Sequence, residues 1–369
     1  MDKEKKEPLI HITKRKMISK KHEWAIRLGS ILIALIVCAI ITTLTTHLNP
    51  LAVYASMWEG SFGSERKIWA LLKELSILLI ISVALAPAFK MKFWNLGGGG
   101  QVMAGVLATT TCMITLGSKL PNGALIIVSL IAALAAGALW AFRPAFCSDK
   151  WNTNETLFTL MMNYVATQIV AYFIIIWESP KGSGKIGIIN SSTEAGWMPV
   201  IGGKQYLLVV LVAIVVTIFM YIYLKYSKHG YELSVVGESE NTARYVGINV
   251  GKVIVRTLIL CGLICGLTGF LLVTSTDHTM TTTLEGGRGF LGVMVAWLAH
   301  FNPIGMVLSG LLIVFMGRGA GEISTAFGLN RSFGDILTGV ILFFVIGSEF
   351  FINYQVHFRK SSGKEASDV

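Results

Sequence analysis

Amide and hydroxyl side chains inside apolar segments are the groups of this sequence with the most specific chemistry. Residues 95–101 place four consecutive glycines at the start of an apolar segment, between two amide side chains. A glycine run disfavours a continuous helix, and interrupted helices let transporters hold polar solutes with exposed backbone dipoles. Neutral amides and hydroxyls suit an uncharged polar solute better than an ion. The predicted pathway residues are Asn95, Gly98, Gly99, Gln101, Asn163, Tyr164 and Gln168.

Each of these features also has a structural explanation. The glycines would allow close helix packing, and the amides would form hydrogen bonds between helices. Acidic residues inside a membrane are functional candidates by default, but Glu74 and Glu349 lie near the ends of apolar segments, so we expect them at the membrane interface. The sequence has no ladder of acids or histidines for a proton relay, which disfavours a proton-coupled carrier.

A compact segment of mixed charge, residues 236–248, lies between two long apolar runs. Ser239 can act as the N-cap of a short helix whose first turns contain Thr242 to Tyr245, and Gly247 is a suitable stop. A short amphipathic helix on the water side of a membrane can occupy the groove of a partner protein. The alternative is an ordinary cytoplasmic turn.

The sequence shows no catalytic or metal-binding pattern. Its seven histidines are scattered, and it contains neither His-x-x-x-His nor Gly-x-Ser-x-Gly. Residues 182–185 resemble a phosphate loop only superficially, because Ser179 stands where glycine is required and Ile186 follows the lysine. Cys261 and Cys265, beside several glycines, indicate a helix-packing face rather than a metal site. We therefore expect no enzyme activity and no cofactor in this chain, and any ATP to be hydrolysed by another polypeptide.

The elements that must position these residues are membrane helices. The chain is 53% hydrophobic and only 14% charged, whereas soluble domains carry about 25% charged residues. We predict an all-α polytopic bundle of about ten spans, or eight spans plus a re-entrant pair at 290–317. Residues 24–357 form the membrane domain, and residues 1–23 and 358–369 are tails. The predicted apolar segments are 24–46, 68–89, 93–116, 124–142, 156–177, 206–226, 253–274, 290–299, 303–317 and 336–354.

The distribution of Lys and Arg predicts the orientation. Half of the net charge of +10 comes from the first 27 residues, and the loops expected inside hold 20 Lys and Arg against nine outside. The positive-inside rule then places both termini and the loop 227–252 in the cytoplasm, with the chain in the cell membrane. No basic face interleaved with aromatic residues appears, so we expect no nucleic-acid partner.

Three blocks of the sequence resemble the permease subunits of ABC importers for simple sugars, nucleosides and branched-chain amino acids. The likeness is greatest to permeases that work with nucleoside-binding lipoproteins. The blocks follow the order of that family, and a weaker fourth echo covers residues 289–305. They read Phe-Trp-Asn-Leu-Gly-Gly-Gly-Gly-Gln at 93–101, Asn-Glu-Thr with Met-Asn-Tyr at 154–164, and Gly-Glu with Ala-Arg-Tyr-Val-Gly-Ile-Asn at 237–249.

The resemblance implies that residues 237–248 form a coupling helix that docks on a separate cytoplasmic ABC ATPase. It also implies a second permease subunit, an extracytoplasmic solute-binding lipoprotein and a nucleoside as solute. A simple sugar is the nearest alternative, and a secondary carrier or channel is the alternative from another class. The family usually carries Glu where this chain has Gly99, so that acid is missing here or supplied by the second permease. The predicted coupling residues are Gly237, Glu238, Asn241, Ala243, Arg244, Tyr245, Gly247 and Ile248.

Overall fold

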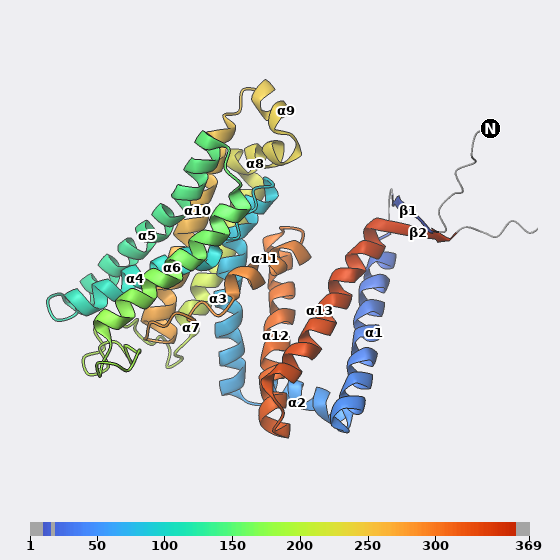
Figure 1. Ribbon diagram of the computed structural model, residues 1–369, viewed down its shortest axis with the longest axis horizontal. Helices are drawn as coiled ribbons and strands as arrows, with labels where there is room; N and C mark the ends of the chain where they lie inside the picture. The colour runs from blue at the N-terminus through green and yellow to red at the C-terminus, as the bar shows by residue number, and fades with distance from the viewer. Residues whose placement is uncertain (1–9, 16–18, 359–369) are drawn as a thin grey trace, which may run out of the picture. The chain divides into compact units, whose positions relative to one another are not determined.

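The computed structural model describes residues 10–15 and 19–358, and helices form most of this part of the chain (Figure 1). The chain divides into two compact units, one of residues 1–63 and 316–369 and the other of residues 64–315. Helix α12 (Pro303–Phe327) passes from the second unit into the first. The first unit also contains β1 (Ile10–Lys14), α1 (Lys20–Thr46), α2 (Pro50–Phe62), α13 (Arg331–Asn353) and β2 (Tyr354–Phe358).

The second unit holds the remaining elements. Most of its helices are long, and two short helices, α8 and α9, follow one another between α7 and α10. These elements are α3 (Glu65–Lys90), α4 (Gly98–Leu116), α5 (Asn122–Trp151), α6 (Glu155–Trp177), α7 (Leu207–Tyr226), α8 (Lys228–Glu238), α9 (Glu240–Tyr245), α10 (Val250–Leu271), the π-helical turn η1 (Leu272–Thr276) and α11 (Arg288–Leu298).

Helix α10 is the centre of the second unit, and it packs against α5, α4 and α3. Glycines make this packing possible, because a Cβ added at Gly137 on α5 would lie 2.2 Å from the carbonyl oxygen of Gly262 on α10. A Cβ at Gly105 on α4 would lie 2.6 Å from the carbonyl oxygen of Gly266. Cys261 and Cys265 are fully buried beside these contacts as free thiols. The predicted small-residue packing face is confirmed, and residues 10–15 and 19–358 contain no cluster of metal-ligating side chains.

Nine helices of the described residues are long and apolar enough to cross a membrane. They correspond to nine of the ten predicted apolar segments, so the all-α polytopic fold is confirmed. The tenth, predicted at 290–299, is α11, and its 11 residues are too short to span a bilayer alone. The segment predicted to end at 317 was too short, because α12 continues to Phe327 and is long enough to cross.

The two ends of the described chain pair with each other in the first unit. Strands β1 and β2 form an antiparallel two-stranded sheet in which Ile10 lies opposite Phe358. Below this sheet α1 packs along α13, and Arg27 donates a hydrogen bond of 2.9 Å to the carboxylate of Glu349. The negative charge of Glu349, near the end of α13, is therefore paired with the positive charge of Arg27. The pairing of β1 with β2 brings the two ends of the described chain together.

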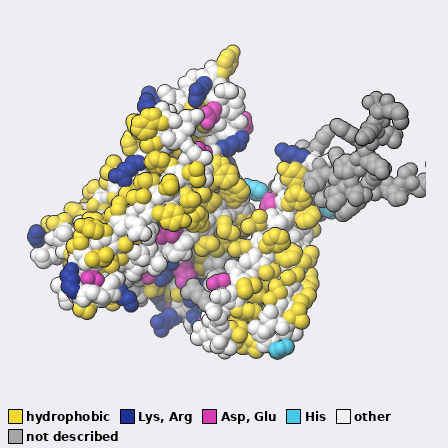
Figure 2. All heavy atoms as spheres, in the orientation of Figure 1, with side chains coloured by type: hydrophobic (Ala, Val, Ile, Leu, Met, Phe, Trp, Pro, Cys, Tyr) yellow, Lys and Arg dark blue, Asp and Glu magenta, His cyan; other side chains and the backbone are white. Residues whose placement is uncertain are grey.

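Hydrophobic side chains cover much of the second unit on the face that Figure 2 shows. Ile131 and Leu139 of α5 and Tyr172 of α6 are each more than 60% exposed. Lys and Arg gather instead around α8 and α9 and around the loops at the opposite end of the unit. A belt of exposed apolar side chains between two charged ends is the surface expected of a protein that spans a bilayer.

Candidate functional site

The connection between α3 and α4, residues 91–97, is irregular backbone, and it contains Asn95 of the first predicted pathway block. The Asn95 side chain is 0% exposed, and its Oδ1 accepts hydrogen bonds from the backbone N–H of Gly97 (3.1 Å) and from Nε2 of Gln101 (3.3 Å). In the part of the chain that the structure describes, Nδ2 of Asn95 and Oε1 of Gln101 have no hydrogen-bond partner. The two amides therefore keep unused hydrogen-bonding capacity inside the protein.

The glycine run does not interrupt a helix. Helix α4 begins at Gly98, with Gly97 as its N-cap, so three of the four glycines form the first helical turn. The predicted segment that began at residue 93 started too early. Each glycine lets a neighbour approach closely: a Cβ added at Gly98 would lie 3.1 Å from Leu85, and one at Gly100 would lie 2.9 Å from Oδ1 of Asn163. Close packing, the alternative given above, explains the run.

A stripe on α6 satisfies the backbone at the start of α4. Asn163 accepts a hydrogen bond of 2.7 Å from the N–H of Gly100 and donates one of 2.8 Å to the carbonyl oxygen of Leu96. One turn earlier, Oγ1 of Thr159 accepts a hydrogen bond of 3.1 Å from the N–H of Leu96. Asn163 thus acts as an N-terminal cap supplied by another helix. Tyr164 and Gln168, predicted with it, lie on an exposed part of α6.

A polar cavity of about 170 Å³ lies beside this stripe. Gly99 and Met103 of α4, the middle of α6, the loop 277–287 and the first turn of α11 surround it. Besides Gly99, two other predicted pathway residues line the cavity, namely Asn163 and Tyr164. The polar residues Thr167, Thr282 and Glu285 also line it. Asn95, Gly98, Gln101 and Gln168 do not line it. The structure therefore brings three of the seven predicted pathway residues into one cavity.

Glu285 is the charged group of this cavity, and the sequence analysis did not single it out. Its Oε2 accepts a hydrogen bond of 2.9 Å from the N–H of Gly287, and its Oε1 accepts one from the N–H of Gly289. A Cβ added at Gly99 would lie 3.1 Å from the carboxylate carbon of Glu285. The carboxylate thus rests against the position where the resembled family carries Glu. In this chain an acid, Glu285, reaches the same place from the loop 277–287.

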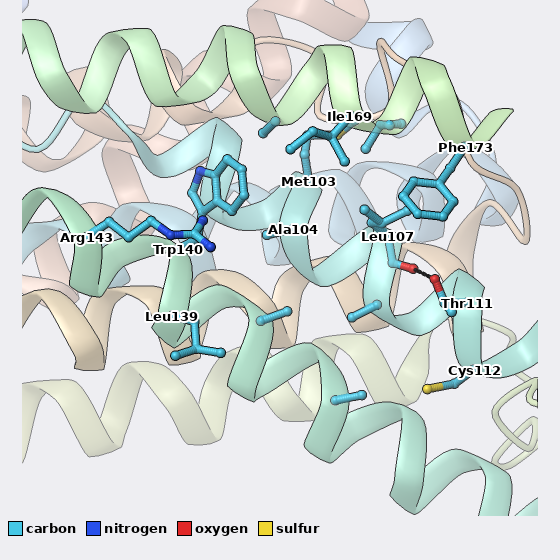
Figure 3. Close-up of a pocket in the computed structure, with 15 residues that line it drawn as sticks. Met103, Ala104, Leu107, Thr111, Cys112, Leu139, Trp140, Arg143, Ile169 and Phe173 are labelled. Atoms are coloured by element: carbon cyan, nitrogen blue, oxygen red, sulfur yellow. Dashed lines mark hydrogen bonds between the residues drawn. The ribbon is translucent and has the colours of Figure 1, made fainter. Parts of the chain in front are cut away.

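A larger groove of about 440 Å³ lies among α4, α5 and α6, and Figure 3 shows its lining. Leu107 and Met103 of α4 and Phe173 and Ile169 of α6 make most of its wall apolar. The guanidinium of Arg143 lies at one end, 4.9 Å from the centre of the Trp140 ring. A polar solute would lose hydrogen bonds to water in this groove without replacing them, so the smaller polar cavity is the better candidate for solute recognition.

The second predicted site, the coupling segment, forms two short helices at one end of the second unit (Figure 1). Ser239 is the N-cap of α9, and its Oγ accepts a hydrogen bond of 3.3 Å from the N–H of Thr242. Gly247 follows the helix with a φ of 82°. These predicted details are confirmed. The expected single helix over 237–248 is wrong, however, because Gly237 and Glu238 end α8 before the break at Ser239.

Helix α9 presents most of its surface to solvent. Tyr245 is 92% exposed, and Asn241 and Arg244 are also exposed, whereas Ala243 is buried. Arg244 lies 3.7 Å from Glu240 in an ion pair between successive turns. Ile248 closes the segment by donating its N–H to the carbonyl oxygen of Ala243 at 2.9 Å. A short helix with one buried contact and an exposed aromatic ring can enter a partner's groove without unfolding.

Helix α8 attaches this segment to the long helices. A Cβ added at Gly237 would lie 2.3 Å from the carbonyl oxygen of Lys90, the last residue of α3. Glu232 accepts a hydrogen bond of 2.8 Å from Arg256 on α10, and this guanidinium is the main cause of the lowered pKa of Glu232. A displacement of α8 therefore acts directly on both α3 and α10.

The loop 178–185, which superficially resembles a phosphate loop, is occupied by a carboxylate of its own chain. Glu178 accepts hydrogen bonds from the N–H groups of Gly182 (2.7 Å) and Gly184 (2.8 Å). These two bonds lower the pKa of Glu178. The N–H groups that a phosphate would need already hold this anion, which agrees with the failure of the sequence pattern.

A polytopic helical bundle with a polar cavity and an exposed short helix at one end is the architecture of a membrane transport subunit. Residues 68–346 match the family described as the permease component of the branched-chain amino acid transport system. The match covers most of the chain, and the protein belongs to this family of multi-pass membrane permeases.

Individual relatives are similar over most of their length. The glucose ABC transporter permease protein TsgB13 of Haloferax volcanii is 26% identical over 84% of each chain. The guanosine ABC transporter permease protein NupP of Bacillus subtilis is 27% identical over 80% of this chain and 85% of its own. The nucleoside ABC transporter permease protein NupB of Lactococcus lactis is 24% identical over 80% and 84%.

Proposed function

We propose that this chain is the membrane-spanning permease subunit of an ATP-driven ABC importer whose solute is a nucleoside. Two relatives bear the names of guanosine and nucleoside permeases, and their similarity spans at least 80% of this chain. The observation that carries the proposal is the exposed helix α9 at one end of a unit that also contains a polar cavity, in a chain of the permease family. A separate ABC ATPase supplies the energy. A second permease subunit and an extracytoplasmic solute-binding lipoprotein complete the importer.

We further propose that both termini and α9 face the cytoplasm. Six spanning helices, α1 and α3 to α7, separate β1 from α8 in the described chain, so an even number of crossings places both on one side. Three spanning helices of the described residues, α10, α12 and α13, follow α8, so the pairing of β2 with β1 on that side requires α11 and the loop before it to complete a tenth crossing. The excess of Lys and Arg in the loops of that side supports the cytoplasm. Docking of the ATPase on α9 would then move α8, and through Gly237 and Glu232 it would move α3 and α10.

The solute pathway in this proposal uses the polar cavity together with the buried amides of Asn95 and Gln101. Neither amide is more than 1% exposed, so a solute reaches their free hydrogen-bonding groups only after the start of α4 separates from α6. Asn163 holds that contact closed through two hydrogen bonds. A conformational change that breaks these bonds would open the path, as alternating access requires.

Uptake measurements with and without the ATPase test the function. Cells that express this chain with its second permease subunit and the ABC ATPase should accumulate radiolabelled nucleosides, and cells without the ATPase should not. Uptake of glucose or ribose in place of nucleosides would favour the simple-sugar permease, which the relative from Haloferax volcanii supports. Full nucleoside uptake without any ATPase would reject the ABC proposal in favour of a secondary carrier or channel.

A further inference from the structure

The polar cavity combines one carboxylate with hydroxyl groups and aromatic rings. Tyr164 and Thr167 come from α6, Thr282 and Glu285 from the loop 277–287, and Phe290 from α11. Tyr164 is 68% exposed and Phe290 is 49% exposed, so the aromatic side of the cavity is open. Neither the family description nor the names of the relatives assign a role to any of these residues.

Glu285 keeps hydrogen-bonding capacity for a ligand. No Lys, Arg or His among the described residues forms an ion pair with its carboxylate, and the neighbouring Arg288 donates instead to the backbone carbonyl of Leu284 at 3.0 Å. Each carboxylate oxygen accepts one backbone N–H, from Gly287 or Gly289. An ionised carboxylate offers about four acceptor positions. Two positions, one on each oxygen, therefore remain for donors from the cavity.

Two parallel acceptors fit a pair of adjacent hydroxyl groups. Proteins commonly recognise ribose by a carboxylate that accepts hydrogen bonds from its hydroxyls. Bases stack on exposed aromatic side chains, as the open side of this cavity would allow. The cavity volume of about 170 Å³ suits a sugar ring inside and a base outside against Tyr164 and Phe290.

We propose that Glu285 is the residue that recognises the sugar of the solute, by accepting hydrogen bonds from a vicinal diol. This inference rests on the proposed function and adds a specificity to it. The chain selects ribonucleosides over 2′-deoxyribonucleosides, because a deoxy sugar leaves one carboxylate acceptor without a donor. A hydrogen bond to a charged group corresponds to roughly a 10- to 100-fold preference.

The test compares uptake of adenosine and 2′-deoxyadenosine by the complete importer, in the wild type and in Glu285→Gln. The Gln side chain keeps the size of Glu, and its one oxygen can still accept a hydrogen bond from a glycine N–H. Its NH₂ group cannot accept, so Gln cannot receive hydrogen bonds from both glycine N–H groups and from both hydroxyls of the sugar. We expect the wild type to prefer adenosine by roughly 10-fold or more. In Glu285→Gln this preference should fall close to one, with 2′-deoxyadenosine uptake largely retained.

Glu178→Gln is the matched control. Glu178 also holds two glycine N–H groups with one carboxylate, at 2.7 and 2.8 Å, but it lies in the loop after α6 and does not line the cavity. This control should leave the preference unchanged. Thr282→Val, at an exposed position of the cavity, should lower the preference without affecting folding.

The outcomes separate the two proposals. An unchanged preference in Glu285→Gln, or equal uptake of both nucleosides by the wild type, would overturn the role of Glu285. Where Glu285→Gln fails to reach the membrane, Glu285→Asp replaces it as the test, and an unchanged preference in that variant would overturn the role as well. Absence of all nucleoside uptake in the wild type would instead refute the proposed solute, and the same comparison with ribose and 2-deoxyribose would then decide whether Glu285 recognises a diol.

Discussion

Replacing Gly237 by alanine should disconnect the coupling segment from the membrane helices. Gly237 is buried in the last turn of α8, two residues before Ser239, the N-cap of α9. The added Cβ would lie 2.3 Å from the carbonyl oxygen of Lys90 and 3.2 Å from the Cα of Met91. Both neighbours are backbone atoms that cannot rotate away, and ordinary contact begins at 3.4 Å. The end of α8 must therefore move away from α3 by about 1 Å.

The free energy of this change follows from two opposing terms. Overpacking by one methyl group costs about 1 to 3 kcal/mol. Alanine in a helix is more favourable than glycine by up to about 1 kcal/mol. With the middle of the overpacking range, about 2 kcal/mol, the net loss is about 1 to 2 kcal/mol. This loss corresponds to about a 5- to 30-fold change in an equilibrium. We expect nucleoside uptake to fall by about 5- to 30-fold, because the displaced α9 no longer meets the ABC ATPase in the correct position.

The assay measures initial uptake and thermal unfolding of the purified importer in parallel. Gly123→Ala is the control, because Gly123 lies in the first turn of α5 with no atom near its added Cβ. The control should unfold at the same temperature as the wild type or higher, with full uptake. If Gly237→Ala matched Gly123→Ala in both measurements, the contact between α8 and α3 would have no part in coupling.

Two further changes test other parts of the site. Glu232→Gln should destabilise the protein by about 1 kcal/mol at pH 7, because it breaks the ion pair with Arg256 at a side chain only 16% exposed. Since the folded pKa of Glu232 lies below its ordinary value of 4.5, this contribution is complete above pH 4.5 and disappears as the pH falls through the folded pKa. The unfolding temperature should therefore fall less between pH 7 and pH 3 in the variant than in the wild type. An equal fall in both proteins would show that the ion pair does not contribute to stability. Asn163→Ala should cost about 1 to 3 kcal/mol, since it leaves the N–H of Gly100 and the carbonyl of Leu96 without partners. Gln168→Ala, on an exposed part of the same helix, should change the unfolding free energy by less than about 0.5 kcal/mol.

Apolar length and charge distribution were sufficient to predict the fold class. In the described part of the chain, nine helices long enough to span appear where the apolar segments indicated them, and Ser239 and Gly247 bound α9 as their residue types require. The start of α4 at Gly98 could not be predicted, because Asn163 and Thr159 satisfy its backbone from a different helix. Such long-range caps leave no pattern in the local sequence.

The position of Glu285 shows why the cavity could not be predicted from the sequence. It lies in a polar loop, among glycines and threonines that resemble an ordinary turn. Only the contact between that loop and Gly99 brings its carboxylate to the start of α4. The available signal was one of two acids, Asp277 and Glu285, in the loop between two apolar segments. Gly237 was predicted from the family resemblance, but its contact with the backbone of Lys90 required the structure.

The most direct test of the account is the replacement of the exposed side chains of α9. Tyr245 is 92% exposed, so Tyr245→Ala combined with Arg244→Ala removes surface contacts without disturbing the fold. The tagged variant should reach the membrane with the unfolding temperature of the wild type, yet lose both the co-purifying ABC ATPase and nucleoside uptake. Wild-type uptake together with undiminished ATPase binding would contradict the assignment of α9 as the coupling helix.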